Sequence, residues 1–157
     1  MSIFFRRENM EKVEGTVDKA SLKLLWVKAR QTYNNIKSPA WCKCLHRRIN
    51  FNAQGFHHLL YDGLGHERSP SEQQHKLLLI PLIVPVLAVA PDATYKKVEE
   101  RINRKKNSPI KEIEYWGLTA LVGRNRDVKV KVILKRAGAG QIIFWSVMRL
   151  KTSKKDH

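Results

Sequence analysis

The segment from Phe56 to Ser69, FHHLLYDGLGHERS, concentrates residue types that transfer protons and bind anions. It contains half of the six histidines and ends with Glu67 and Arg68 just before the serine. Cleavage of an RNA phosphodiester without a metal requires a base for the ribose 2′-OH, an acid for the leaving oxygen and cations for the phosphate. Histidine suits the first two roles because its ordinary pKa of ~6.5 lies near neutrality, and arginine suits the third because its planar fork binds two phosphate oxygens. Adjacent side chains on a helix point about 100° apart, so at most one of His57 and His58 is expected to face such a site, and the other would be a surface or capping residue.

A second group of candidate ligands lies in WCKCLH, which contains Cys42, Cys44 and His46. The CxC spacing lacks the gap of about two to four residues with which a structural zinc loop closes, so two free thiols are the preferred interpretation. The chain contains no HExxH, Walker or GxGxxG motif. We therefore expect neither a metal nor a cofactor.

The charge of the chain is strongly positive. Its 157 residues include 30 Lys and Arg against 14 Asp and Glu, a formal net charge of +16, and most of the excess lies from Tyr95 onward. Such an excess is usually matched by RNA or another phosphate backbone, by an anionic membrane or by an acidic protein. Solubility alone is the alternative explanation, although it requires far less net charge.

The longest apolar run, from Leu77 to Ala90, is interrupted by Pro81 and Pro85 and is shorter than the ~20 residues of a membrane span. A buried helical segment is the better interpretation, and no membrane association is expected. The opening residues MSIFFRREN carry charges too early for a signal peptide. Because Cys42 and Cys44 are also too close for an ordinary disulfide, we predict a cytoplasmic protein.

The length suits one domain, and we expect a loose lead-in over residues 1–15 followed by a single domain over 16–157, with its core at about 49–150. Apolar residues at three- and four-residue spacing predict an amphipathic helix from Val17 to Asn35. A connection over 36–48 should lead to a short strand over 49–51 and then to a short helix that carries GFHHLLYD.

The segment SPSE predicts the start of another helix, with Ser69 as N-cap, Pro70 in the first position and Glu72 completing a capping box. This helix should bend or restart at Pro81 and Pro85, because an internal proline removes a backbone hydrogen bond. Residues 95–106, YKKVEERINRKK, are expected to form a short charged helix or a solvated connection.

After Pro109, β-branched and aromatic residues dominate in EIEYWGLTALV, DVKVKVILKR and GQIIFWSVMRL, and the turn-forming segments GRNRD and AGAG separate these runs. Three consecutive antiparallel strands follow. The middle strand alternates apolar residues with Lys129, Lys131 and Lys135, which therefore share the face away from the core. The last strand is apolar on both faces and is expected to be central. Helices followed by strands predict an α+β fold with the helices packed on one side of the sheet.

Taken in order, the blocks GFHHLLYDG, ERSPSEQQHKLLLIPL, EYWGLTA, VKVKVILKR and IIFWSVMRL resemble those of phage- and toxin-associated nuclease domains of the barnase–EndoU–colicin–RelE (BECR) superfamily. The resemblance covers roughly residues 49–150. It implies N-terminal helices on a C-terminal curved antiparallel sheet of three to four strands, and metal-independent cleavage of RNA, frequently tRNA or ribosome-bound RNA. It also implies an acidic antitoxin or immunity protein as a candidate partner that would cover the basic surface.

By position within these blocks, the resemblance assigns His58 as the histidine that activates the 2′-OH and Arg68 as a phosphate-binding residue. Lys131 and Lys135 match basic positions of the penultimate strand, and Ser146 matches the polar residue of FWS. The expected products are a 2′,3′-cyclic phosphate and a 5′-OH end. The predicted catalytic residues are His58, Arg68, Lys131 and Ser146, and the predicted substrate-binding residues are His57, Lys129, Lys135, Arg136 and Trp145.

Each of these residue types also has an ordinary structural explanation. The Ser146 hydroxyl, in an otherwise apolar strand, would need a hydrogen-bond partner, which could equally be a backbone group of the sheet. Lysines on a strand face are usually solvated, and Trp116 and Trp145 could stack on a base but would more often belong to a core. A non-catalytic RNA- or ribosome-binding module and a phage structural protein that docks an acidic partner are the competing hypotheses, and no oligomeric state is indicated.

Overall fold

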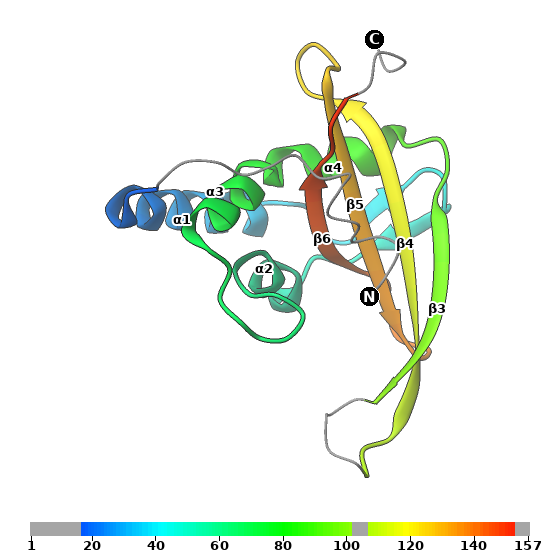
Figure 1. Ribbon diagram of the computed structural model, residues 1–157. Helices are drawn as coiled ribbons and strands as arrows, with labels where there is room; N and C mark the ends of the chain where they lie inside the picture. Colours follow the sequence, from blue (N-terminus) through cyan, green and yellow to red (C-terminus); the bar gives the residue numbers. More distant parts are fainter. Residues whose placement is uncertain (1–16, 102–106, 153–157) are drawn as a thin grey trace.

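The computed structural model describes residues 17–101 and 107–152, so the lead-in expected over residues 1–15 lies outside the described part of the chain. The described residues form helices in the first half of the chain and an antiparallel sheet in the second half. The helices α1, α2 and α3 gather on one side of the sheet (Figure 1). The α+β class predicted from the sequence is confirmed.

Four helices are described, and capping residues set where three of them begin. The side chains of Asp18, Asn52 and Ser69 accept hydrogen bonds from the first-turn amides of α1 (Lys19–Asn34), α2 (Ala53–Leu60) and α3 (Pro70–Leu78). In α3 the Ser69 Oγ accepts from the Glu72 amide at 3.2 Å, as the capping box predicts.

The apolar run begins in the last residues of α3 and continues in a separate helix, α4 (Ile80–Val89), with Pro81 in its first turn, so the predicted restart at this proline is confirmed. Pro85 lies inside α4 without ending it. Among the described residues, no single helix is long and apolar enough to span a membrane. The helices α3 and α4 have the required length and hydrophobicity only when they are taken together, and a bend of 48° separates them.

The segment over 36–48 is more ordered than the predicted connection. It contains the strand β1 (Ala40–Cys42), which pairs antiparallel with β2 (Arg47–Ile49). The short strand predicted near Ile49 therefore exists, but it begins two residues earlier and belongs to this small hairpin.

The main sheet is an antiparallel meander with the order β3-β4-β5-β6, comprising β3 (Thr94–Arg101), β4 (Ile110–Val122), β5 (Val128–Ala137) and β6 (Ile143–Arg149). On β5, Val130, Val132 and Leu134 belong to the core that α1, α2 and α4 share with the sheet, as the alternation predicts. The β3–β4 hairpin extends as an arm beyond the rest of the molecule (Figure 1).

The expectation of a helix or a solvated connection over residues 95–106 is wrong over its described part. Residues of β3 pair one by one with β4, from Thr94 opposite Gly117 to Arg101 opposite Ile110. Cross-strand polar contacts support this pairing: Lys97 Nζ lies 3.0 Å from a Glu112 carboxylate oxygen, and the Tyr95 hydroxyl donates to Glu114 at 2.6 Å. These contacts join residues distant in sequence, so helix-like local composition did not decide the structure. Residues 102–106 lie outside the described part of the chain.

The last strand, β6, lies at the end of the sheet order and is not central as expected. It is apolar on both faces because a second cluster, formed by Ile113, Tyr115, Ile133 and Met148, packs separately from the main core. Its outer edge is covered by other segments: the Phe144 amide donates to Asn50 O at 2.9 Å, and Lys76 Nζ donates to Val147 O at 2.9 Å. Protected in this way, an edge strand has the apolar composition of a central one.

Candidate functional site

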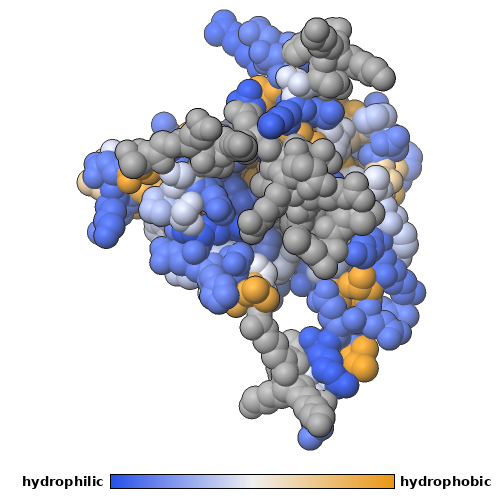
Figure 2. All heavy atoms as spheres, in the orientation of Figure 1, coloured by the Kyte–Doolittle hydropathy of each residue, from blue (hydrophilic) through white to orange (hydrophobic). Residues whose placement is uncertain are grey.

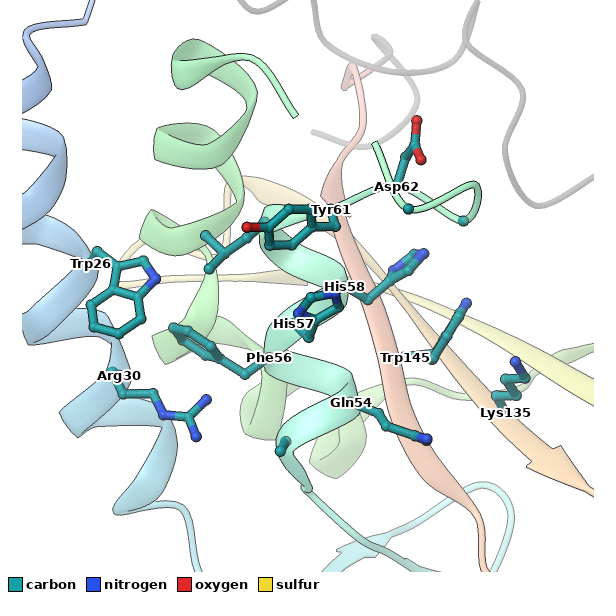
Figure 3. A pocket seen from close by; sticks show the side chains of 14 residues that line it. Trp26, Arg30, Gln54, Phe56, His57, His58, Tyr61, Asp62, Lys135 and Trp145 are labelled. Atoms are coloured by element: carbon teal, nitrogen blue, oxygen red, sulfur yellow. The ribbon is translucent and has the colours of Figure 1, made fainter. Parts of the chain in front are cut away.

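A cleft of about 940 Å³ opens beside α2, between α1 and the strands β5 and β6 (Figure 3). Of the site residues predicted from the sequence, His57, His58, Lys135 and Trp145 line this cleft. On the α1 side its wall consists of Trp26, Arg30 and Phe56 together with Tyr61. Trp26 and Arg30 lie across the cleft from Trp145 and Lys135 in Figure 3.

The position of α2 depends on a close approach to β6. A Cβ atom at Gly55 would lie 2.6 Å from the backbone oxygen of Phe144 and 2.7 Å from the Tyr33 hydroxyl. The same hydroxyl donates a hydrogen bond of 2.7 Å to Asn52 O at the start of the helix. Glycine at position 55 therefore allows α2 to place its histidines beside the sheet.

His58 faces the sheet from α2. Its side chain is buried, with 6% of the residue exposed, and its ring stacks on Trp145 with centroids 4.2 Å apart. Burial, helped by the nearby positive charges of Arg68 and Lys76, lowers the pKa of His58 to about 3. The imidazole is therefore neutral at neutral pH. Its Nδ1 atom has no hydrogen-bond partner among the described residues.

Trp145 reaches the cleft because of an irregularity in the β5–β6 pairing. Ile133 pairs with Ser146 and Leu134 with Phe144, so Trp145 is an extra residue in β6. Such a bulge redirects a side chain out of the regular alternation. The ammonium group of Lys135 lies 4.0 Å from the centroid of the Trp145 ring, a cation–π contact. Burial lowers the pKa of Lys135 below its ordinary value.

His57 occupies the open side of the cleft. Its side chain is exposed, and its ring stacks on that of Tyr61 with centroids 4.3 Å apart and planes inclined by 12°. The two residues are one helical turn apart, a spacing that brings side chains together on a helix surface. Of the two adjacent histidines, His57 is thus the one that solvent and a ligand can reach directly.

Arg68 does not line the cleft. Its Nε donates a hydrogen bond of 3.1 Å to the backbone oxygen of His58, and its Nη1 lies 3.8 Å from a carboxylate oxygen of Glu72. The backbone oxygen of Arg68 accepts a hydrogen bond of 2.7 Å from the buried Gln73 side chain. Arg68 therefore fixes the loop after α2 to the helix and brings a positive charge close to His58.

The remaining predicted residues lie apart from the cleft. Ser146 is fully buried in β6 opposite Ile133, and its hydroxyl has no hydrogen-bond partner among the described residues. Lys131 pairs with Met148 on β6, and burial lowers its pKa. Lys129 lines a separate hollow beside α4. Arg136 forms an ion pair with Glu114 and contacts Trp116, so its charge is already matched.

Lys76 is a buried cation that the sequence reading did not single out. The residue is 5% exposed, and burial lowers the pKa of its amine to about 7, with the nearby charge of Arg68 adding to the effect. A signal was present in the sequence: Gln73, Lys76 and Leu77 share one face of a helix, and this face is buried. The wall residues Trp26 and Tyr61 were likewise missed as site residues, because they fit an amphipathic pattern equally well.

Comparisons of this chain with protein-family models, with curated proteins and with solved structures give no match. Within residues 17–101 and 107–152, no group of three or more His, Cys, Asp or Glu side chains is arranged to hold a metal ion. Cys42 and Cys44 are free thiols.

Proposed function

We propose that this chain is a metal-independent endoribonuclease of the toxin type, with its active site in the cleft beside α2. The observation that carries the proposal is the composition of that cleft. It gathers two imidazoles, a phenol, two cations, the exposed ring of Trp26 and the partly exposed ring of Trp145, within a protein of net charge +16. Cations bind phosphate, aromatic faces stack on unpaired bases, and imidazoles transfer protons. Membership of the BECR superfamily, and its curved-sheet architecture, belong to the same proposal.

In this proposal the ribose 2′-oxygen attacks phosphorus and transfers its proton to a histidine of α2. The leaving 5′-oxygen takes a proton from water in the open cleft, which yields a 2′,3′-cyclic phosphate and a 5′-OH end. Lys135 offsets the charge that develops on the phosphate. We assign the base to His57 because its ring is exposed in the cleft, and we assign to His58 the role of holding Trp145 and, through it, Lys135.

The assignment of the base to His58, which the resemblance implies, stays a prediction. A phosphate beside His58 would offset the positive charges of Arg68 and Lys76, which raises the pKa of the imidazole. Burial is the larger cause of the lowered pKa, and a phosphate does not remove it. This difference favours His57, and variants of both residues separate the two assignments.

The proposed RNA target is tRNA or ribosome-bound RNA, and an acidic antitoxin or immunity protein is the proposed inhibitor. The described basic residues support both partners equally, because either carries negative charge. We also propose a cytoplasmic location, in which Cys42 and Cys44 would remain reduced.

A non-catalytic RNA-binding module is the second candidate function, and the state of His58 favours it. A histidine with a pKa of about 3 is a weak base, and its stacking on Trp145 is also what a rigid binding platform requires. In this case His57 would contact RNA without transferring a proton.

The deciding experiment incubates the purified protein with total tRNA and a short mixed RNA in EDTA, followed by end-group analysis on denaturing gels. We expect discrete products with cyclic phosphate ends from the wild type. His57→Ala should reduce the cleavage rate by ~10²–10⁴-fold, the usual contribution of a general base, with little change in RNA affinity. His58→Phe, which retains a ring against Trp145, should retain most of the activity.

Matched controls decide how the result is interpreted. Lys43→Gln removes one exposed charge from the β1–β2 hairpin at a position that does not line the cleft, and it should leave cleavage unchanged. Equal cleavage by wild type and His57→Ala, with loss only in His58→Phe, would return the base to His58. Cleavage that disappears in EDTA and returns with a divalent ion would refute the metal-free mechanism. Intact RNA with a salt-sensitive gel shift would establish the binding module instead.

A further inference from the structure

A second hollow, of about 360 Å³, adjoins the cleft along the sheet. Gln54 at the start of α2 and Lys135 on β5 line both cavities, so the two share a boundary. Beyond this boundary the hollow continues to the loop end of the β3–β4 arm, where Arg101 pairs with Ile110. Its far wall is lined by Arg101 and Lys111, with Gln141 from the β5–β6 turn beside them.

The charged residues that line the second hollow are mainly cationic. Lys111 is exposed, and the Arg101 guanidinium is held at the arm by a hydrogen bond of 3.1 Å from its Nη1 to Ser108 O. Glu100 is the acidic residue in its lining, and it accepts a hydrogen bond of 3.4 Å from the Tyr115 hydroxyl. Together with Lys135 at the boundary, the cations outnumber this carboxylate, as a site for a polyanion requires.

Lys135 and Lys111 are farther apart than two successive nucleotides of one strand. Lys135 lies opposite Tyr115, and Lys111 lies four residues before Tyr115 on β4, on the same face of the sheet. At a strand rise of ~3.3 Å per residue this spacing is roughly 13 Å. Successive nucleotides in a stacked strand are ~3.4 Å apart, so several nucleotides fit between Lys135 and Lys111.

We propose that the cleft and the second hollow form one continuous track for single-stranded RNA, in which Arg101 and Lys111 hold phosphates several nucleotides away from the reacting one. The inference rests on the proposed function and names its substrate class. A single strand fits better than a duplex, because the exposed ring of Trp26 and the partly exposed rings of Tyr61 and Trp145 line the cleft, where unpaired bases could stack on them. An acidic polypeptide would satisfy the cations alone and would leave these rings without a role.

The test measures binding of fluorescent 2′-O-methyl RNAs, which cannot be cleaved, as dinucleotide, tetranucleotide and octanucleotide, in EDTA and at several salt concentrations. We expect affinity to rise steeply from dinucleotide to octanucleotide. The double variant Arg101→Gln with Lys111→Gln should weaken octanucleotide binding by about tenfold or more while leaving dinucleotide binding unchanged. The slope of log affinity against log salt should fall by ~1.4, at ~0.7 per lost phosphate contact.

The matched control, Lys43→Gln with Arg47→Gln, removes the same charge from exposed positions of the β1–β2 hairpin. An equal loss in this control, or a dinucleotide that binds as tightly as the octanucleotide, would overturn the track. Duplex RNA or polyglutamate that binds more tightly than the single strand would overturn it in favour of another polyanion. The double variant also loses the hydrogen bond from Arg101 to Ser108 O, which could disturb the fold of the arm. Lys111→Gln alone removes no described hydrogen bond, so weaker octanucleotide binding by this single variant would not arise from misfolding. Length-independent cleavage of RNA would refute the track alone, whereas failure to bind or cleave any RNA would refute the proposed function as well.

Discussion

At the scale of single residues, the site is governed by what burial does to charged groups. His58 and Lys76 both lie in the interface between helices and β6, and burial lowers the pKa of each. Arg68 keeps its hydrogen bond to the backbone of His58 and adds positive charge to the same region. A buried group whose charged form is disfavoured reduces the stability of the fold at those pH values at which the unfolded chain would be charged. His58 offers the clearest measurement of this effect.

The first prediction is that His58 makes the protein sensitive to acid. The unfolded chain takes up a proton at the ordinary pKa of 6.5, whereas the folded protein resists protonation until about pH 3. The unfolded state therefore binds more protons across this range, and the free energy of unfolding falls as the pH falls. His58→Phe, which keeps a ring against Trp145, should show a shallower decline in urea midpoints across the same range. The carboxylates titrate in both proteins and cancel in the difference, so parallel curves would contradict the burial of His58.

The sequence predicted some of the residues that lie together in the cleft but not the arrangement of their side chains. The types and spacing in FHHLLYDGLGHERS are enough to predict proton transfer and anion binding, and His57, His58, Lys135 and Trp145 do line one cleft. Which histidine faces the open side depends on how α2 rotates against β6, a property of tertiary packing. Lys129 and Lys131 were placed on one face by the alternation of β5, which gives the face of a residue but not its position along the sheet. The ion pair that occupies Arg136 joins it to Glu114 on the neighbouring strand, and such a cross-strand pair is not visible in the sequence.

At the scale of elements, the site depends on the contact between α2 and β6. Gly55 is the point of closest approach, and the bulge that exposes Trp145 lies on the facing strand. A side chain at position 55 would push α2 away from Phe144 and from Tyr33 of α1. Both walls of the cleft would then move relative to each other, because α2 carries one set of lining residues and the sheet carries another.

The second prediction follows from this contact. Gly55→Ala should destabilise the protein by about 1–3 kcal/mol, the usual cost of overpacking, even though alanine favours a helix by ~1 kcal/mol. The control is Gly63→Ala, in the turn after α2, where no atom lies within 4 Å of the added methyl. This control should change the unfolding free energy by less than about 0.5 kcal/mol, as surface substitutions usually do. Urea denaturation measures both, and a neutral Gly55→Ala would show that the approach of α2 to β6 is loose.

The strands β3 and β6 were predicted incorrectly for the same reason: contacts between residues distant in sequence, and not local composition, determine where each strand lies. For β3, the run YKKVEER has helix-forming composition, but pairing with the long strand β4 outweighs local preference. For β6, apolar residues on both faces indicated a central strand, while the structure covers an edge strand with α2, α3 and residues near Asn50. The capping box before α3 was predicted correctly because its contacts are local, between Ser69 and Glu72.

At the scale of the whole molecule, the net charge of +16 is distributed over a surface that is mostly hydrophilic in the view of Figure 2. Some of this charge is matched within the fold, as in the pair of Lys97 with Glu112 and the pair of Arg136 with Glu114. The formal excess nevertheless remains after every acidic residue has been counted against a basic one. Mutual repulsion of the remaining charges opposes the compact state and favours binding of a polyanion.

The last prediction tests whether repulsion between like charges or attraction within the internal ion pairs has the larger effect on thermal stability. Salt screens repulsion between like charges and also weakens the internal ion pairs; the Debye length falls from about 30 Å at 0.01 M to about 8 Å at 0.15 M. Because the excess is so one-sided, repulsion should dominate, and the thermal midpoint should rise over this range of sodium chloride. The Arg101→Gln and Lys111→Gln double variant, with two fewer positive charges, should show a smaller rise. A midpoint that falls with salt would mean that ion pairs such as Lys97–Glu112 outweigh the repulsion, and it would remove self-repulsion as a reason for this protein to bind a polyanion.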